Sequence, residues 1–175
     1  LELNSIFSVI VYNNKLFYIN SSGQIVSVDP ISKQGEKVFV LPPGKQLAEN
    51  KINDFYIYQN RLFYLYGSWC QDYLNECNLQ LYEYNMTTKT SRLLADNLTD
   101  REIVVYDKME NRLYLNNNGG DGGCGWWQND AYDFSSKQVI KLDKGSSCDD
   151  EPETDLHVSL SKKIRDLQAS QVKNI

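Results

Sequence analysis

The sequence contains few of the residues from which catalytic and metal sites are built. It has one histidine, His157, and its 4 cysteines include no Cys-x-x-Cys pair, so a zinc site of the usual spacing is excluded. No Gly-x-Ser-x-Gly sequence is present, and a single histidine gives little basis for a Ser-His-Asp triad. We therefore expect no catalytic residue, no metal ligand and no enzymatic activity.

Positive charge and long apolar stretches are also scarce. The formal net charge is −5, from 18 Lys and Arg against 23 Asp and Glu. Nucleic acid needs a basic stripe and anionic lipid attracts basic segments, so we exclude both as partners. No apolar run is long enough to cross a bilayer, which predicts a soluble domain. The chain starts at Leu1, and we expect any signal or anchor to lie upstream of it.

What the sequence does contain is an internal repeat of three units. Each unit has an Asn-basic-Leu-aromatic phrase, and the leucines of these phrases, Leu16, Leu62 and Leu113, are 46 and 51 residues apart. Each unit also has a second phrase, which starts with an acid or amide and ends with lysine, at residues 29–33, 85–89 and 133–137. A period of about 50 residues in a turn-rich chain is typical of propeller-like arrays.

Each unit has the pattern of four short β-strands joined by tight turns. The chain has 12 tyrosines, which suit half-buried strands because the ring packs on the sheet while the hydroxyl reaches a polar partner. Four antiparallel strands form one propeller blade, so we predict an all-β fold of three four-stranded antiparallel blades with a short C-terminal tail. The expected ranges are 5–41, 52–95 and 102–143 for the blades, 1–148 for the repeat domain and 149–175 for an acidic loop and tail.

The second repeat phrase also carries a family resemblance. Residues 79–94 read LQLYEYNMTTKTSRLL, which resembles the outer strand pair of propeller blades of the Tol-system and dipeptidyl-peptidase type. The resemblance extends over about residues 5–143. It rests on turns and aromatic residues, implies propeller blades, and carries no catalytic residue to this chain.

Three blades are too few to close a ring, because propellers normally have about four to eight. The chain is therefore expected to be a fragment of a longer chain, to pair with itself as a homodimer of six blades or join a larger assembly, or to be closed by its tail. Within the tail, Leu156, Leu160, Ile164 and Leu167 recur at helical spacing. We predict a helix there, with a hairpin around Val158–Ser161 as the alternative.

Two insertions interrupt the repeat between the second and third strands of units two and three. The distance between the two repeat phrases is 13 residues in unit one but 23 and 20 in units two and three. Because alternate connections of an antiparallel blade lie at the same end, Cys124 and Cys148 are expected close together. We predict disulfides that pair Cys70 with Cys77 and Cys124 with Cys148, which favours an oxidising, extracytoplasmic compartment.

The same insertions hold all 3 tryptophans, Trp69, Trp126 and Trp127. Each either packs on a neighbouring disulfide or belongs to a recognition surface, since loops on a rigid scaffold carry function. We name the three tryptophans and Asp121 as candidate ligand-binding residues. We predict no cofactor. Oxygen-bearing side chains that could bind calcium occur at two places, Asn116–Asn118 with Asp121 and the acidic run at 149–155.

The Gly120–Gly125 stretch matches a dinucleotide-binding pattern but does not open an apolar helix, so we interpret it as a loop. Together these features predict an extracytoplasmic module, secreted, periplasmic or at the cell surface, that binds a protein or glycan through its Trp- and Cys-bearing loops. The alternative is the propeller portion of a larger hydrolase-type enzyme whose catalytic domain lies elsewhere.

Overall fold

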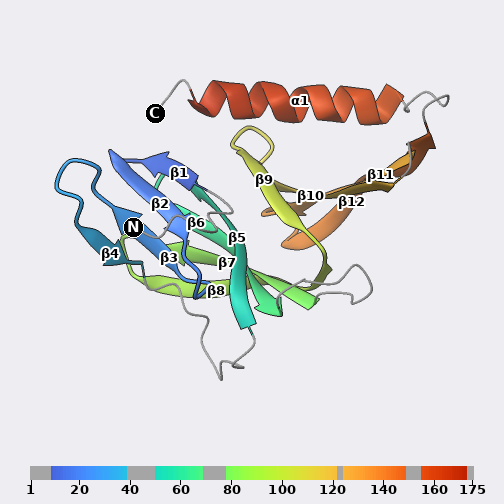
Figure 1. Cartoon of the computed structure of the whole chain (residues 1–175). Helices are drawn as coiled ribbons and strands as arrows, with labels where there is room; N and C mark the ends of the chain where they lie inside the picture. Colours follow the sequence, from blue (N-terminus) through green and yellow to red (C-terminus); the bar gives the residue numbers. More distant parts are fainter. Residues whose placement is uncertain (1–8, 39–49, 69–77, 122–123, 149–154, 173–175) are drawn as a thin grey trace. The chain divides into compact units, whose positions relative to one another are not determined.

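The computed structural model describes residues 9–38, 50–68, 78–121, 124–148 and 155–172, which contain twelve β-strands and one α-helix (Figure 1). The elements are β1 (Val9–Tyr12), β2 (Lys15–Ile19), β3 (Ile25–Val28) and β4 (Gly35–Lys37) in blade one, β5 (Asn50–Tyr58), β6 (Arg61–Ser68), β7 (Asn78–Asn85) and β8 (Thr90–Thr99) in blade two, β9 (Glu102–Asp107), β10 (Arg112–Asp121), β11 (Cys124–Asp133) and β12 (Gln138–Cys148) in blade three, and α1 (Asp155–Val172).

Each blade is a separate four-stranded antiparallel sheet whose strands are neighbours in chain order. This confirms the predicted all-β fold of three propeller-like blades. The chain divides into two compact units between Asp100 and Arg101, so that blades one and two form one unit, and blade three with α1 forms the other. The outer ends of the predicted first blade, residues 5–8 and 39–41, lie outside the described residues.

The repeated second phrase forms the same turn in all three blades. Its first residue, Asp29, Asn85 or Asp133, accepts hydrogen bonds through Oδ1 from the two backbone amides that follow at positions three and four of the phrase. Its lysine closes the turn with φ of 58–59° and donates its backbone N–H to the carbonyl of the first residue. The phrase recurs because each turn needs a side-chain acceptor at its first position and a residue with a left-handed backbone conformation at its last. The amides also hold the pKa of Asp29 and Asp133 below the usual range.

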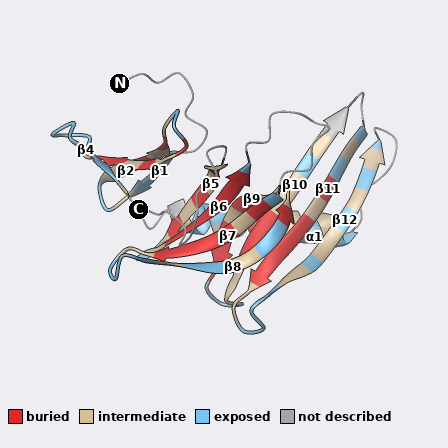
Figure 2. Cartoon of the chain, turned by 90° about the horizontal axis from the view of Figure 1, so that it is seen from below, coloured by how far each residue is buried: buried red, intermediate tan, exposed pale blue. Residues whose placement is uncertain are grey.

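Burial falls from the middle of each blade to its outermost strand. Figure 2 shows buried residues concentrated on strands such as β6 and β7, whereas β4, β8 and β12 are mostly exposed or intermediate. In the first unit the core joins blade one to blade two, through Phe17, Ile19 and Ile25 on one side and Ile52 and Leu62 on the other. This gradient is expected for blades that pack face to face.

In the second unit, α1 lies across one face of blade three (Figure 1). Its C-terminal half covers the free edge of β9, where Gln168 and Gln171 donate side-chain hydrogen bonds to the carbonyls of Val104 and Tyr106. Such contacts protect an edge strand from pairing with another chain. The predicted tail helix is confirmed, although Leu156 is 59% exposed and does not join a buried face. Among the described residues, no helix is both long and apolar enough to span a membrane.

Candidate functional site

The insertion in blade three extends its sheet instead of forming a loop. β10 and β11 pair without interruption from Arg112–Asp133 to Asp121–Cys124. The prediction that this insertion is a loop is therefore wrong. The segment contains no proline, so every residue keeps the backbone N–H that a sheet ladder needs. The described residues of the Gly120–Gly125 stretch end β10 and begin β11, and a pair of β-strands is not the context of a dinucleotide-binding turn.

A disulfide closes the end of the ribbon. Cys124 and Cys148 are direct partners in the β11–β12 register, their Cα atoms are 4.0 Å apart, and they are bonded. This pairing was predicted from the sequence and is confirmed. The other predicted pair, Cys70 with Cys77, lies outside the described residues, as does Trp69.

Trp126 lies on the surface of the ribbon next to this disulfide. It faces Gly119 across β10 and β11, and a Cβ atom at Gly119 would be 2.4 Å from the Trp126 Cζ2 atom. The indole therefore covers the backbone of Gly119 closely, which only a glycine permits. Trp126 remains 45% exposed. The result is an aromatic ring held flat on a strand, with its outer side open to solvent.

Trp127 points to the opposite side of the sheet because successive strand residues alternate. It is 6% exposed and covers Gly145, where an added Cβ would be 2.5 Å from its ring. Its Nε1 donates a 2.7 Å hydrogen bond to Oδ2 of Asp143. Trp127 therefore packs within the second unit against Gly145 and His157. Of the two tryptophans that the structure describes, Trp126 is the one that presents its ring to solvent.

The covered side of the ribbon holds the first turns of α1. The imidazole of His157 lies 4.1 Å from the Trp127 ring, and its Nδ1 is 3.0 Å from Oδ2 of Asp143. Its Nε2 is 3.5 Å from Oγ of Ser161, one helical turn further on. No sequence pattern indicates this cluster, because it forms only when the fold brings β12 to the start of α1.

The order Asp143, His157, Ser161 is that of a hydrolytic triad, but its geometry fits a structural role better. The contact between Ser161 and His157 is at the outer limit of a hydrogen bond. The imidazole is 14% exposed and lies against an indole ring, so little space remains for a substrate. We interpret the cluster as the contact that fixes α1 to blade three.

The open side of the ribbon around Trp126 is polar. Ser146 is the direct neighbour of Trp126 on β12, and the next row on the same face consists of Asn117, Gln128 and Lys144. Lys144 and Ser146 are exposed, and Gln128 donates through Nε2 to Asp130 Oδ2 at 3.2 Å. The backbone of Asp121 ends β10 near the tip of the ribbon, and its side chain lies outside the described features. We call Asn117, Trp126, Gln128, Lys144 and Ser146 the Trp126 face.

The asparagine run that we considered for calcium lies along β10. Alternation places Asn116 and Asn118 on one face and Asn117 on the other, so their side-chain oxygens do not converge. In the part of the chain that the structure describes, no group of three His, Cys, Asp or Glu residues is arranged to hold a metal ion. The acidic run at 149–154 is not described.

Comparison with known families identifies the repeat. A family model described as "YycP, beta-propeller domain" matches residues 1–110, which include blades one and two and the start of blade three. No curated protein matches the sequence significantly.

The chain is also similar to solved structures of low sequence identity. TolB from Acinetobacter baumannii has a TM-score of 0.52 and 16% identity, over 79% of this chain and 32% of TolB. An oligogalacturonate lyase in complex with manganese has a TM-score of 0.45 and 11% identity, over 79% and 53%. The oligogalacturonate lyase of Vibrio parahaemolyticus has a TM-score of 0.45 and 7% identity, over 75% and 50%. The chain thus spans about a third of TolB and about half of each lyase.

Proposed function

The chain belongs to the YycP β-propeller domain family, and we propose that it is an extracytoplasmic binding module that recognises a protein or glycan through the Trp126 face. The observation that carries this proposal is the exposed indole of Trp126, fixed over Gly119 at the end of a disulfide-closed ribbon. A rigid aromatic side chain loses little conformational entropy on binding, which makes it an effective contact residue.

The surroundings of Trp126 favour a glycan over a protein. A protein hot spot usually lies in a well-packed pocket whose surrounding contacts exclude water. Here the ring is bordered by the amides of Asn117 and Gln128, by a hydroxyl and by an ammonium group. The open side of the indole can stack on a sugar ring, while amides and hydroxyls hydrogen-bond to sugar hydroxyls.

The proposed location rests on the disulfide between Cys124 and Cys148. Disulfides persist in secreted, periplasmic and cell-surface proteins and are rare in reducing compartments. A module in such a compartment would meet cell-wall or extracellular glycans. We propose that it binds them without turning them over.

A glycan microarray tests the proposal. We expect the purified protein to bind a restricted set of oligosaccharides and Trp126→Ala to lower the signal about tenfold or more, since a central aromatic contact contributes about 2 kcal/mol. Trp126→Phe should retain part of the signal. Met109→Ala is the matched control, because Met109 is an apolar side chain of the same unit and is 91% exposed.

One outcome would identify the ligand as a protein, and another would refute the proposal. If the array gives no signal and cross-linking to extracytoplasmic proteins yields a partner that Trp126→Ala loses, the ligand is a protein. If Trp126→Ala behaves as the wild type in both experiments, the Trp126 face is not the binding site and the proposal is wrong.

The second candidate function is the propeller portion of a larger hydrolase-type enzyme. The observation that favours it is the partial match to TolB, of which this chain covers 32%. A coding sequence that continues into a hydrolase domain would support it. In that case we expect Trp126→Ala to change substrate selection instead of free glycan binding.

A further inference from the structure

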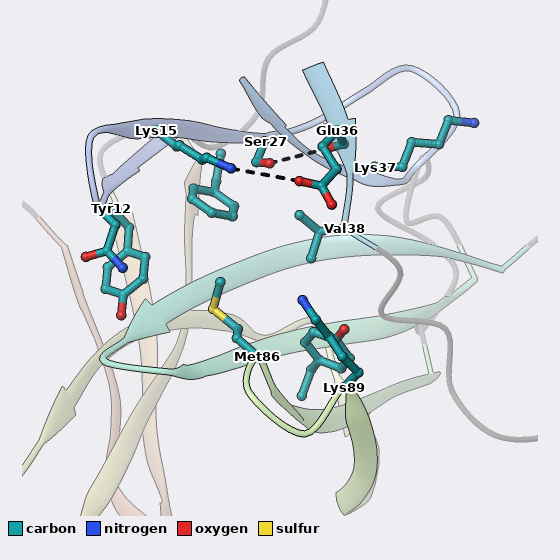
Figure 3. A pocket seen from close by; sticks show the side chains of 11 residues that line it. Tyr12, Lys15, Ser27, Glu36, Lys37, Val38, Met86 and Lys89 are labelled. Atoms are coloured by element: carbon teal, nitrogen blue, oxygen red, sulfur yellow. Dashed lines mark hydrogen bonds and ion pairs between the residues drawn. The ribbon is translucent and has the colours of Figure 1, made fainter. Parts of the chain in front are cut away.

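A second candidate site lies in the first unit, far in sequence from the Trp126 face, and this one is concave. A cavity of about 500 Å³ opens between blade one and blade two (Figure 3). Its lining comes from β2, β3, β4 and the ends of β1 and β7, together with the β1–β2 and β7–β8 turns. Its volume is within the range of about 300–1,000 Å³ that is usual for small-molecule sites.

The floor of this cavity is apolar and aromatic. Phe17 and Val38 line it from blade one, and Tyr84 and Met86 line it from blade two. Tyr84 is 4% exposed, and within the described part of the chain its hydroxyl has no hydrogen-bond partner. Burial raises the pKa of Tyr84, with a further contribution from the nearby charge of Glu36. The hydroxyl is therefore a protonated donor at neutral pH.

The rim carries an excess of positive charge in a chain whose net charge is −5. Lys15, Lys37 and Lys89 line the cavity, against one acidic residue, Glu36. Figure 3 shows Lys15 directed at Glu36, with a distance of 3.8 Å from Nζ to Oε2, whereas the Lys37 side chain points away from the cavity. Lys89 reaches from the opposite blade toward Val38, and no carboxylate among the described residues pairs with it.

We propose that this cavity binds a small amphipathic organic anion, a carboxylate or sulfonate with an aromatic or branched apolar body. The apolar body lies on Phe17, Val38 and Met86, and the acidic group pairs with the ammonium of Lys89. Glu36 competes with that acidic group, because it occupies Lys15 and adds a negative charge at the rim. Both charged contacts are exposed, so binding weakens as salt increases.

The repeat provides a matched control for Lys89. Lys33 and Lys137 occupy the same turn position in blades one and three, with the same left-handed φ of 58° against 59° for Lys89. They donate the same backbone hydrogen bond to the residue four positions earlier. Neither lines the cavity. A Lys→Gln change at the three positions therefore alters the same turn in the same way, and only Lys89→Gln alters the proposed site.

The two methionines of the chain allow direct detection. Met86 lines the cavity, and Met109 is 91% exposed on the β9–β10 turn of the other unit. We would label the methionine methyl groups with ¹³C and titrate the protein with 8-anilinonaphthalene-1-sulfonate as the anionic probe. The expected result is a saturable shift of the Met86 methyl signal, with the Met109 signal unchanged. Equal shifts of both signals, or no shift of Met86, would overturn the proposal.

Charge variants complete the test. We expect Lys89→Gln to weaken sulfonate binding about two- to five-fold and Glu36→Gln to strengthen it by a similar factor, the range for one exposed charge pair. Lys33→Gln should have no effect. The uncharged analogue N-phenyl-1-naphthylamine should bind independently of Lys89. If Lys33→Gln weakens binding as much as Lys89→Gln, the probe senses the overall charge and the site is not the one proposed.

Discussion

At the scale of single residues, the two adjacent tryptophans of blade three each pack over a glycine of a neighbouring strand. Gly119 and Gly145 are the cross-strand neighbours of Trp126 and Trp127, and each leaves room for an indole over the backbone. The two sites have the same local geometry but opposite exposure, 45% for Trp126 and 6% for Trp127. The contrast separates a ring that is available to a ligand from a ring that holds the unit together.

Alanine substitutions at the two glycines should therefore have different effects. In Gly145→Ala the new Cβ meets a buried ring that cannot move, and we expect a loss of about 1–3 kcal/mol in the free energy of unfolding, as in an overpacked core. In Gly119→Ala the exposed ring swings away, so stability changes by about 0.5 kcal/mol or less. Urea unfolding measures both. Equal losses would contradict the different roles that we assign.

At the scale of elements, α1 is fixed to blade three by a charged cluster as well as by His157. Lys163 contacts Asp107 at 3.2 Å, the hydroxyl of Tyr114 at 2.8 Å, and Glu110. Burial alone would raise the pKa of Asp107, but the backbone amides of Glu110 and Met109, together with Lys163, hold it below its usual value. The hydrogen bond from Lys163 is the main reason that the pKa of Glu110 is lowered.

These shifts predict how the helix contact depends on pH. Lowered carboxyl pKa values stabilise the folded state above about pH 4, and this stabilisation is lost as pH falls through the folded-state values. The pKa of Lys163 is raised by its partners against the effect of burial, so its contribution persists up to about pH 10.5 and is lost above it. The ion pairs of Lys163 with Asp107 and Glu110 therefore stabilise the folded state between about pH 4 and about pH 10.5.

Lys163→Gln isolates this contribution. We expect a loss of about 1 kcal/mol at pH 7, because Lys163 is 37% exposed and solvent screens the pair. The difference from the wild type should be smaller at pH 2.5 than at pH 7, because Asp107 and Glu110 take up protons as the pH falls through their lowered pKa values. Urea unfolding at the two pH values measures it. A difference that is the same at both would mean that Lys163 acts through packing alone.

The disulfide is the other constraint on this unit. It closes a segment with a sequence separation of 24 residues, for which the entropic model gives about 3 kcal/mol. We expect the Cys124→Ser, Cys148→Ser double variant to lose up to this amount and to lower the thermal midpoint. Differential scanning calorimetry measures the change. An unchanged midpoint would show that the β11–β12 ladder already holds this end of the sheet.

Local chemistry explains which elements were predictable. The turns at Asp29, Asn85 and Asp133 are set by a side chain and the backbone beside it, so the repeat identified the blades correctly. The Cys124–Cys148 pair followed from the order of strands. The length of the ribbon was not predicted because Asn- and Gly-rich sequence favours loops. Two features of the sequence were consistent with paired strands, namely the absence of proline and the glycine and tryptophan that pair across the tip. The docking of α1 depends on non-local contacts such as Trp127–His157, which no local pattern encodes.

At the scale of the whole molecule, blade one has an apolar face that the described residues leave partly open. Val9 and Val11 are 53% and 42% exposed, and the β1–β2 register places Tyr18 and Leu16 beside them on the same face. The opposite face of the blade forms the core with blade two. Open apolar sheet faces favour association, since burial contributes about 25 cal/mol for each Å².

We predict that a second copy covers this face in solution, as the expectation of a homodimer requires. Val11→Lys should shift the protein toward the monomer, because a charge cannot be buried without a partner. Sedimentation velocity at tens of micromolar measures the mass of both proteins. A wild type that is monomeric at this concentration would rule out the dimer.

Fluorine NMR of the 5-fluorotryptophan-labelled protein tests the central claim most directly, because the chain has 3 tryptophans with separable roles. The titrant is the oligosaccharide that the array selects. We predict a saturable shift of the Trp126 signal, assigned with Trp126→Phe, while the signal of buried Trp127 stays unchanged. A binding oligosaccharide that moves only the Trp127 or Trp69 signal, or none of the three, would contradict recognition through the Trp126 face.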